Sequence, residues 1–268
     1  MTDTHKGAAL ITGASTGIGA VYADRLAKRG YDLILVARDV ARLEALAAKL
    51  RVHGVKVDVL PADLTARADL LKVEQRLRDD QAITLLVNNA GLAGGGGFAA
   101  PDIDKIEALI QLNVTAVTRL AAAAAPGFVA RGIGAIINLS SVVAYAPELF
   151  AGVYSATKAY VFNLSRSLQL ELGPKGVYVQ VVAPSATATE IWDRSGMPIS
   201  NLPAGSVMPV DDLVDAALVG FDRREAITLP SLPGEGQWQT LEAARLAMAQ
   251  NFRNEKPAAR YRSSEPVT

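Results

Sequence analysis

Two side chains with complementary acid–base chemistry, Tyr154 and Lys158, lie four residues apart in the sequence. The apolar positions after them recur with helical spacing and predict a helix; they are Tyr160, Val161, Leu164, Leu168 and Leu172. Side chains four apart share one face of a helix, so the lysine ammonium could favour the tyrosine phenolate. Lowering the pKa of a tyrosine from ~10 to roughly 7 takes about 4 kcal/mol. The pair therefore predicts a tyrosine that exchanges a proton with a substrate.

Alone, such a pair is usually two ordinary helix residues, but two further polar side chains favour a chemical role. Ser141 follows the apolar run 136–139, which predicts a buried strand. A strand end and a helix start can face each other across a cleft. Asn113 lies inside a predicted helix over 102–131, where an asparagine is a middling helix former, and the length of that helix suggests a kink.

The composition excludes several classes of function. The chain has 268 residues, half of them hydrophobic, and 27 basic residues balance 27 acidic ones. No net charge therefore recruits nucleic acid or an anionic membrane. The absence of cysteine excludes thiolate chemistry, and the two histidines, His5 and His53, have no ligand or triad spacing. We expect both histidines at the surface, and no metal.

The N-terminal residues 1–7 contain no apolar core of a signal peptide. We also expect no apolar stretch of membrane-spanning length. The sequence therefore predicts a cytoplasmic protein that does not bind membranes.

A glycine loop follows the first predicted strand, residues 8–12, and opens a helix. Its glycines are Gly13, Gly17 and Gly19, in the pattern T-G-x-x-x-G-x-G. Such a loop lets backbone N–H groups approach a pyrophosphate at a helix N-terminus. Glycines also serve plain turns, but the first strand–helix turn is where a dinucleotide-binding fold needs this loop.

The second predicted strand, residues 32–37, ends directly before Arg38. In dinucleotide folds an acidic side chain at this place binds the 2′-hydroxyl of NAD, and an arginine accommodates the 2′-phosphate of NADP. Arg38 thus favours NADP(H), with NAD(H) possible because Asp39 could turn toward a hydroxyl.

The set Asn113, Ser141, Tyr154 and Lys158 resembles the catalytic residues of the short-chain dehydrogenase/reductase family, and the glycine loop has that family's spacing. The resemblance covers residues 8–190. It implies that Tyr154 is the general acid in carbonyl reduction and the base in the reverse reaction. Ser141 would bind the substrate oxygen, Lys158 would lower the tyrosine pKa and bind the nicotinamide ribose, and the Asn113 carbonyl would hold a relay water. Ser140 could compete with Ser141, which alone has the family's spacing.

The resemblance also implies coenzyme contacts along the chain. Asp63 would bind the adenine ring, although it could instead cap a helix. Thr189 would bind the nicotinamide carboxamide, and Pro184–Ser185 replaces the family's Pro-Gly, which puts the local geometry in doubt. The basic residue that the family often has in the glycine loop is Thr16 here. The expected coenzyme-binding residues are Gly13, Ser15, Thr16, Gly17, Ile18, Gly19, Arg38, Asp63, Leu64, Asn89, Ala90, Gly91, Tyr154, Lys158, Pro184, Thr187 and Thr189.

Strands alternate with helices throughout, which predicts an α/β fold: a single doubly wound Rossmann-type domain over 1–268 with a parallel sheet of about seven strands and helices on both faces. Residues 6–190 would form the coenzyme-binding and catalytic core. The apolar segment 190–210 either packs onto the core or forms a lid over a substrate pocket. Asp211 is expected to cap a helix, and 254–268 to be a frayed tail. The alanine run 121–125 indicates a close-packed helix face, and the resemblance implies a homodimer or homotetramer.

The predicted function is hydride transfer between NADP(H) and a small-molecule carbonyl or secondary alcohol, with an apolar substrate favoured by the lid. A 3-oxoacyl reductase of the fatty-acid type is the main alternative within the oxidoreductases. A non-catalytic dinucleotide-binding sensor and a methyltransferase on a similar fold are alternatives from other classes. Neither would need Tyr154 and Lys158.

Overall fold

The computed structural model describes residues 6–94, 99–150, 152–195 and 198–262. His5, Met197 in the apolar segment 190–210, and part of the expected tail lie outside these residues. The chain divides into two compact units, Met1–Ser231 and Leu232–Thr268. Each unit is described by itself.

The first unit contains a seven-stranded sheet in which every neighbouring pair is parallel, in the order β3-β2-β1-β4-β5-β6-β7. The strands are β1 (Ala8–Thr12), β2 (Asp32–Ala37), β3 (Val57–Pro61), β4 (Ile83–Asn88), β5 (Gly134–Leu139), β6 (Val177–Val182) and β7 (Ile227–Thr228). The order reverses between β1 and β4, which is the switch point where open α/β sheets bind ligands. The predicted fold class is confirmed.

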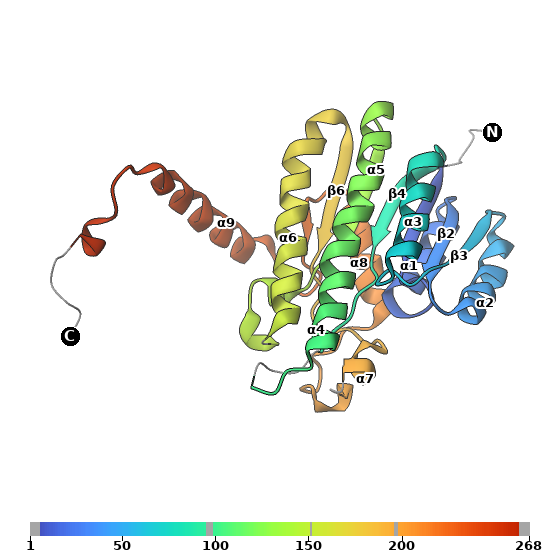
Figure 1. Ribbon diagram of the computed structural model, residues 1–268, viewed down its shortest axis with the longest axis horizontal. Helices are drawn as coiled ribbons and strands as arrows, with labels where there is room; N and C mark the ends of the chain where they lie inside the picture. Colours follow the sequence, from blue (N-terminus) through green and yellow to red (C-terminus); the bar gives the residue numbers. More distant parts are fainter. Residues whose placement is uncertain (1–5, 95–98, 151, 196–197, 263–268) are drawn as a thin grey trace. The chain divides into compact units, whose positions relative to one another are not determined.

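Helices cover both faces of this sheet (Figure 1). On one face, α1 (Gly17–Lys28), α2 (Val40–Leu50) and α8 (Val210–Asp222) share a buried apolar cluster with the strands. On the other face, α3 (Arg67–Asp79), α5 (Val117–Arg131) and α6 (Val153–Leu172) share a second cluster. Because both faces are buried, the strands are continuous apolar runs rather than alternating ones. The sheet therefore forms a rigid floor for the loops at its carboxyl edge.

The predicted kinked helix over 102–131 consists of three segments. A π-helical stretch, Gln111–Ala116, joins α4 (Ile103–Ile110) to α5 and contains Asn113. Three of the five alanines at 121–125, namely Ala121, Ala123 and Ala124, are buried in the core of their own chain. The close-packed helix face is thus confirmed, and its partners are the sheet and α3.

Among the described residues, Ile103–Arg131 is long and apolar enough to cross a membrane by length and composition. The expectation that no such stretch exists was therefore wrong. A buried core helix passes the same test, and 44% of the apolar window is buried here. Leu120 and Phe128 in this helix are each 1% exposed, packed in the second core cluster.

The expected helix cap at Asp211 is wrong, and so is the alternative of a helix cap at Asp63. α8 begins after Pro209 without a side-chain cap, and Asp211 instead accepts a hydrogen bond from Arg25 Nη2 at 2.7 Å. α3 begins at Arg67, and the side chain of Asp63 accepts from the backbone N of Thr65 in the preceding turn (2.9 Å). Both aspartates have charged or turn partners nearby that compete with the helix end.

The second unit is small and helical. It contains α9 (Glu235–Gln250) and two short 3-10 helices, Asn251–Arg253 and Ala259–Tyr261. No residue of α9 is buried, and the described part of the expected tail, residues 254–262, is exposed. His53 in the first unit is also exposed, as expected.

Candidate active site

A cavity of about 980 Å³ lies where the loops after β1, β2, β3, β4, β5 and β6 meet. It brings together nearly all of the residues singled out from the sequence. Among the expected site residues, those that line it are Gly13, Ser15, Thr16, Gly17, Ile18, Arg38, Asp63, Leu64, Asn89, Ala90, Gly91, Ser141, Tyr154, Lys158, Pro184, Thr187 and Thr189. Gly19 and Asn113 do not line it. The carboxyl edge of the sheet thus gathers side chains that are up to 176 residues apart, from Gly13 to Thr189.

Tyr154 and Lys158 occupy the first turns of α6, as predicted. The ammonium of Lys158 is buried and donates a hydrogen bond to the backbone oxygen of Leu139, at the end of β5 (2.9 Å). It also lies 5.7 Å from the centroid of the Tyr154 ring. The strand end therefore fixes the lysine, and the helix carries both residues on the cavity side.

The pKa values of this pair differ in direction from the sequence expectation. Burial raises the pKa of Tyr154 to about 12, and a side-chain hydrogen bond with Ser141 only partly opposes the rise. Burial lowers the pKa of Lys158 to about 8. Desolvation disfavours the charged form of both groups, the phenolate and the ammonium. At neutral pH Tyr154 is accordingly a protonated phenol.

The structure distinguishes the two adjacent serines. The hydroxyl of Ser140 is hydrogen-bonded to α6, where it donates to the backbone oxygen of Lys158 at 2.7 Å. Ser141 makes longer contacts, donating to the oxygen of Pro184 at 3.3 Å and accepting from the N of Val143 at 3.4 Å. Ser141 also forms the hydrogen bond with Tyr154. The hydroxyl beside the phenol therefore belongs to Ser141, the residue expected from the sequence.

Asn113 is buried behind the cavity rather than in its wall. Its side chain bonds both backbone groups of Leu92, with 2.9 Å for each bond, and donates to Thr157 Oγ1 at 3.1 Å. The π-helical turn places this polar side chain toward the loop after β4 instead of along the helix. Asn113 thus links that loop to α6, one turn from Tyr154. The relay water assigned to its carbonyl stays a prediction.

The glycine loop is tied to β4 by a single asparagine. Asn89 Nδ2 donates to the oxygens of Thr12 (2.8 Å) and Gly13 (3.3 Å), and the hydroxyl of Thr12 accepts from the N of Asn89 and of Ala90 at 3.0 Å. Gly19 packs against Gly13 and Asn89, where a Cβ would overlap both. Gly19 is therefore needed to close the loop and does not face the cavity.

Replacing Gly13 by alanine should weaken nucleotide binding by about tenfold or more and lower the free energy of unfolding by about 1–3 kcal/mol. Gly13 has a φ of +67°, and an added Cβ would lie 2.8 Å from Asn89 Nδ2 and 2.9 Å from the Cα of Ala90. Titration and chemical unfolding would measure the two effects. The matched control is Gly132→Ala, which has a similar φ of +65° but nothing within 4 Å of its Cβ. Equal losses of nucleotide affinity in both variants would contradict the assignment of the loop.

The adenosine-side residues lie as expected but are held differently. Arg38 is 67% exposed, with Nη1 3.9 Å from Asp63 Oδ2. Asp39 is the N-cap of α2, and its Oδ1 accepts from the N of Arg42 at 3.0 Å. Asp39 therefore already has a structural role at the place where it could have met a ribose hydroxyl.

Ser185, which replaces the family's glycine, fits without strain. Among the described residues, Arg224 is the non-glycine residue with a positive φ, so the backbone at Ser185 does not need glycine. Thr187 donates to the oxygen of Ser185 at 3.0 Å, and the Cγ2 of Thr189 lies 3.2 Å from the ideal Cβ position of Gly17. The Pro184–Thr189 loop thus faces the glycine loop across the cavity.

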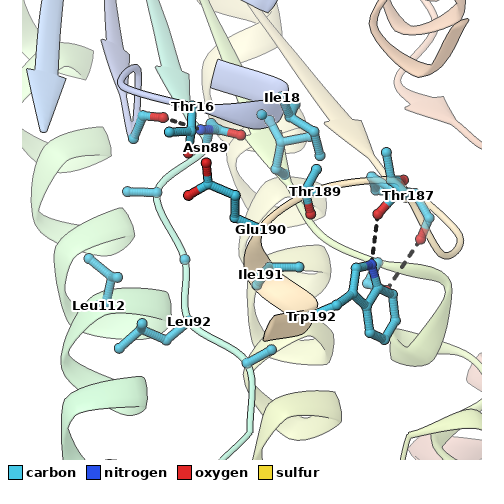
Figure 2. A pocket seen from close by; sticks show the side chains of 18 of the residues that line it. Thr16, Ile18, Asn89, Leu92, Leu112, Thr187, Thr189, Glu190, Ile191 and Trp192 are labelled. Atoms are coloured by element: carbon cyan, nitrogen blue, oxygen red, sulfur yellow. Dashed lines mark hydrogen bonds between the residues drawn. The ribbon is translucent and has the colours of Figure 1, made fainter. Parts of the chain in front are cut away.

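The far end of the cavity has apolar walls that sequence reasoning identified only in part. Ile191 and Leu202, from the expected lid, line it together with Trp192, whose Nε1 donates to the oxygen of Thr187 at 2.7 Å (Figure 2). Phe150 was not singled out from the sequence. Its ring meets that of Tyr154 edge to face at 5.3 Å. An aromatic residue shortly before the tyrosine was the available signal.

Comparisons with known proteins agree with this geometry. The model of the short chain dehydrogenase family matches residues 7–197. A very-long-chain 3-oxoacyl-CoA reductase from Anas platyrhynchos is 35% identical over 188 residues, which are 68% of this chain and 60% of that protein. The chain thus spans less than two thirds of the length of that curated relative.

Two solved structures are similar over nearly their whole length. A short-chain dehydrogenase from Sphingobium yanoikuyae, in complex with NADPH, is 56% identical with a TM-score of 0.93, covering 96% of this chain and 100% of the other. A bulky-bulky ketone specific alcohol dehydrogenase from Comamonas testosteroni is 48% identical with a TM-score of 0.89, covering 97% and 100%. The chain belongs to the short-chain dehydrogenase family.

Proposed function

We propose that this protein is an NADP(H)-dependent oxidoreductase that reduces ketones with bulky apolar substituents to secondary alcohols. The observation that carries the proposal is one cavity in which the glycine loop, the Ser141–Tyr154–Lys158 cluster and an apolar end are continuous. The names of the relatives, which are dehydrogenases and reductases, support the reaction class.

The residues fit a dinucleotide. At Gly13 an added Cβ would meet Asn89 and Ala90, so the loop backbone packs directly on the loop after β4, and at Gly17 an added Cβ would point to Thr189. Both glycines line the cavity, where backbone N–H groups can approach a pyrophosphate. The nicotinamide, when bound, would supply the hydride. Tyr154 would hydrogen-bond the carbonyl oxygen and transfer its proton as negative charge develops there. Ser141 would donate a second hydrogen bond to that oxygen, and Lys158, held by Leu139, would position the coenzyme ribose and add positive potential.

The state of Tyr154 favours reduction. With a pKa raised to about 12 by burial, it holds its proton throughout the neutral range. A protonated phenol can donate to a carbonyl at once, whereas alcohol oxidation first requires the phenolate. The protonated state of Tyr154 therefore favours carbonyl reduction.

This pKa predicts unequal pH profiles for the two directions. Between pH 6 and about 7, where Lys158 with its pKa of about 8 still holds its proton, kcat/KM for ketone reduction should stay nearly flat, while kcat/KM for alcohol oxidation should rise about tenfold per pH unit. The reason is that the phenolate fraction grows tenfold per unit below a pKa of about 12. Initial rates with saturating coenzyme would measure both. A level oxidation profile over pH 6–7 would contradict the raised pKa of Tyr154.

Apolar walls support an apolar substrate. The Phe150 ring packs against the Tyr154 ring, and Leu202 and Trp192 line the same cavity. The Comamonas testosteroni relative is described as specific for bulky-bulky ketones, and its high identity brings that substrate class to this chain as a proposal. A 3-oxoacyl thioester, the substrate class in the name of the Anas platyrhynchos relative, is the second candidate.

Coenzyme preference provides the first test of the proposal. Fluorescence titration of the purified protein with NADPH and NADH at fixed salt should give at least about tenfold tighter binding of NADPH, about 1.4 kcal/mol. The preference for NADP(H) follows from Arg38 and from the capping role of Asp39. Tighter binding of NADH would reject the preference, and no binding of either nucleotide would reject the proposed function.

Several predictions from the sequence remain proposals. These are the cytoplasmic location, the homodimer or homotetramer, the mobility of the segment 190–210 as a lid, and the absence of nucleic-acid and membrane partners. The non-catalytic sensor would bind NADPH without turnover, so a ketone screen with NADPH separates it from the enzyme.

A further inference from the structure

An ion pair crosses the cavity between two segments that are 148 residues apart. Arg42 on α2 directs its Nη1 to the carboxylate of Glu190, at 3.0 Å from Oε1 and 2.9 Å from Oε2. Both residues line the cavity and are about half exposed, with side-chain exposures of 47% and 46%. Glu190 directly follows Thr189, the residue that closes over Gly17. The pair therefore joins the adenosine side of the cavity to the start of its apolar segment.

Glu190 is an unusual residue for a cavity that accepts a polyanionic coenzyme. Figure 2 shows its side chain among the residues that line the cavity, in the same view as Thr16 and Asn89 of the glycine-loop side. A carboxylate in this place repels phosphate unless a cation accompanies it. Arg42 supplies that cation in the structure described.

Arg42 is also four residues after Arg38, which precedes the N-cap of α2, and both residues line the same cavity. Asp39, which lies between them in sequence, uses Oδ1 to cap α2. The glycine loop has Thr16 where a second basic residue was looked for in the sequence. Among the described residues that line the adenosine side, Arg38 lies beside Asp63, and Arg42 lies between Glu190 and Asp39, whose Oδ2 is 3.4 Å from Arg42 Nε. A stronger anion could replace the contacts with Asp63 and Glu190.

We propose that Arg42 is a second recognition residue for the 2′-phosphate of NADP(H), and that Glu190 occupies its guanidinium until the coenzyme arrives. A phosphate dianion offers an arginine more charge and more acceptor oxygens than a half-exposed carboxylate does. Replacement of Glu190 by the phosphate leaves the N-cap of α2 intact, because Asp39 Oδ1 accepts its hydrogen bond from the backbone N of Arg42 and not from the guanidinium. NADH lacks the 2′-phosphate, so it leaves the ion pair in place. The inference rests on the proposed use of NADP(H).

The test compares NADPH and NADH binding to wild type, Arg42→Gln and Glu190→Gln by fluorescence titration. Arg42→Gln should weaken NADPH binding by about tenfold or more and change NADH binding by less than about threefold. Glu190→Gln should tighten NADPH binding by about threefold, because the competing carboxylate is gone. Its effect on NADH should be smaller. Equal weakening of both coenzymes by both variants would overturn the proposal, since that is the result for a pair that only holds the cavity closed.

A second measurement isolates the phosphate from the nicotinamide. In wild type, adenosine 2′,5′-bisphosphate should compete for the coenzyme site with higher affinity than adenosine 5′-monophosphate. Arg42→Gln should reduce the ratio of these two affinities by about tenfold. Arg29→Gln is the matched control, because Arg29 makes a similar exposed ion pair with Asp222 and does not line the cavity. This control should keep the wild-type ratio.

The outcomes distinguish a failure of the proposed function from a failure of the role proposed for Arg42. If wild type binds neither coenzyme, the proposed function fails. If wild type prefers NADPH and Arg42→Gln keeps that preference, only the role of Arg42 fails. Arg42→Lys guards against a folding defect, because it retains the cation at the N-terminal turn of α2. It should give an intermediate loss of NADPH affinity, and an unaltered affinity ratio in both Arg42 variants would overturn the assignment.

Discussion

Replacing Tyr154 by phenylalanine should lower kcat for ketone reduction by about 10²–10⁴-fold while leaving the affinity for NADPH within about threefold of wild type. The variant loses the hydroxyl that hydrogen-bonds Ser141 and carries the transferable proton. It keeps the ring that packs against Phe150. Initial rates of NADPH consumption and a binding titration would measure the two quantities.

The matched control is Tyr160→Phe. Tyr160 lies on the same helix, its hydroxyl is 2.9 Å from Thr118 Oγ1, and it does not line the cavity. This variant should retain nearly full activity. Substantial turnover in Tyr154→Phe, or an equal loss in both variants, would remove Tyr154 from the reaction.

The second large effect concerns stability. Lys158→Met should abolish most activity and yet raise the free energy of unfolding near pH 7 by about 2 kcal/mol. Burial lowers the pKa of Lys158 from 10.5 to about 8, so the native state holds this proton more weakly than the unfolded chain does. That difference costs about 3 kcal/mol below pH 8, and methionine avoids it. The loss of the bond to Leu139 offsets about 1 kcal/mol of the gain.

The direction of the Lys158 pKa shift determines how the free energy of unfolding depends on pH. Between the folded pKa of about 8 and the unfolded value of 10.5, the unfolded state binds more protons. The free energy of unfolding of wild type therefore rises with pH across this window, and the advantage of Lys158→Met shrinks. Urea unfolding at about pH 7 and pH 9 would measure it. Lys105→Met is the control, because Lys105 is 74% exposed and Asp102 raises its pKa. A destabilised Lys158→Met at pH 7 would contradict the account.

Local sequence patterns were sufficient for the framework of the fold. The strands β1 and β2 begin and end at the predicted residues, because each is a largely apolar run between polar or glycine boundaries. The position of the glycine loop and of the Tyr154–Lys158 helix followed from the same patterns. The grouping of distant loops around one cavity followed from the parallel sheet, whose carboxyl ends meet at one edge.

Features that depend on long-range contacts were not predictable. Asn113, in the π-helical stretch, is hydrogen-bonded to the backbone of Leu92, which is 21 residues away. Asp211 was expected to cap α8, but Arg25, 186 residues away, binds it instead. The choice of Ser141 over Ser140 was made from the sequence, but its physical reason, the bond from the Ser140 hydroxyl to the carbonyl of Lys158, needed the structure.

The electrostatics of the site could not be obtained from spacing alone. A tyrosine and a lysine four apart suggested a lowered tyrosine pKa, but the burial of both groups reverses the sign. The ion pair between Arg42 and Glu190 was also hidden, since 148 residues separate its partners. Desolvation and cross-chain pairing both depend on the folded arrangement.

Hydride transfer itself is the central claim, and isotope transfer measures it most directly. NADPH carrying two deuterium atoms at C4 would be incubated with the protein and a bulky aryl ketone, and the alcohol product analysed by mass spectrometry. The account predicts one deuterium on the carbinol carbon, in a product that Tyr154→Phe forms about 10²–10⁴-fold more slowly. An alcohol without deuterium, or no alcohol from any ketone of a broad panel despite tight NADPH binding, would contradict it.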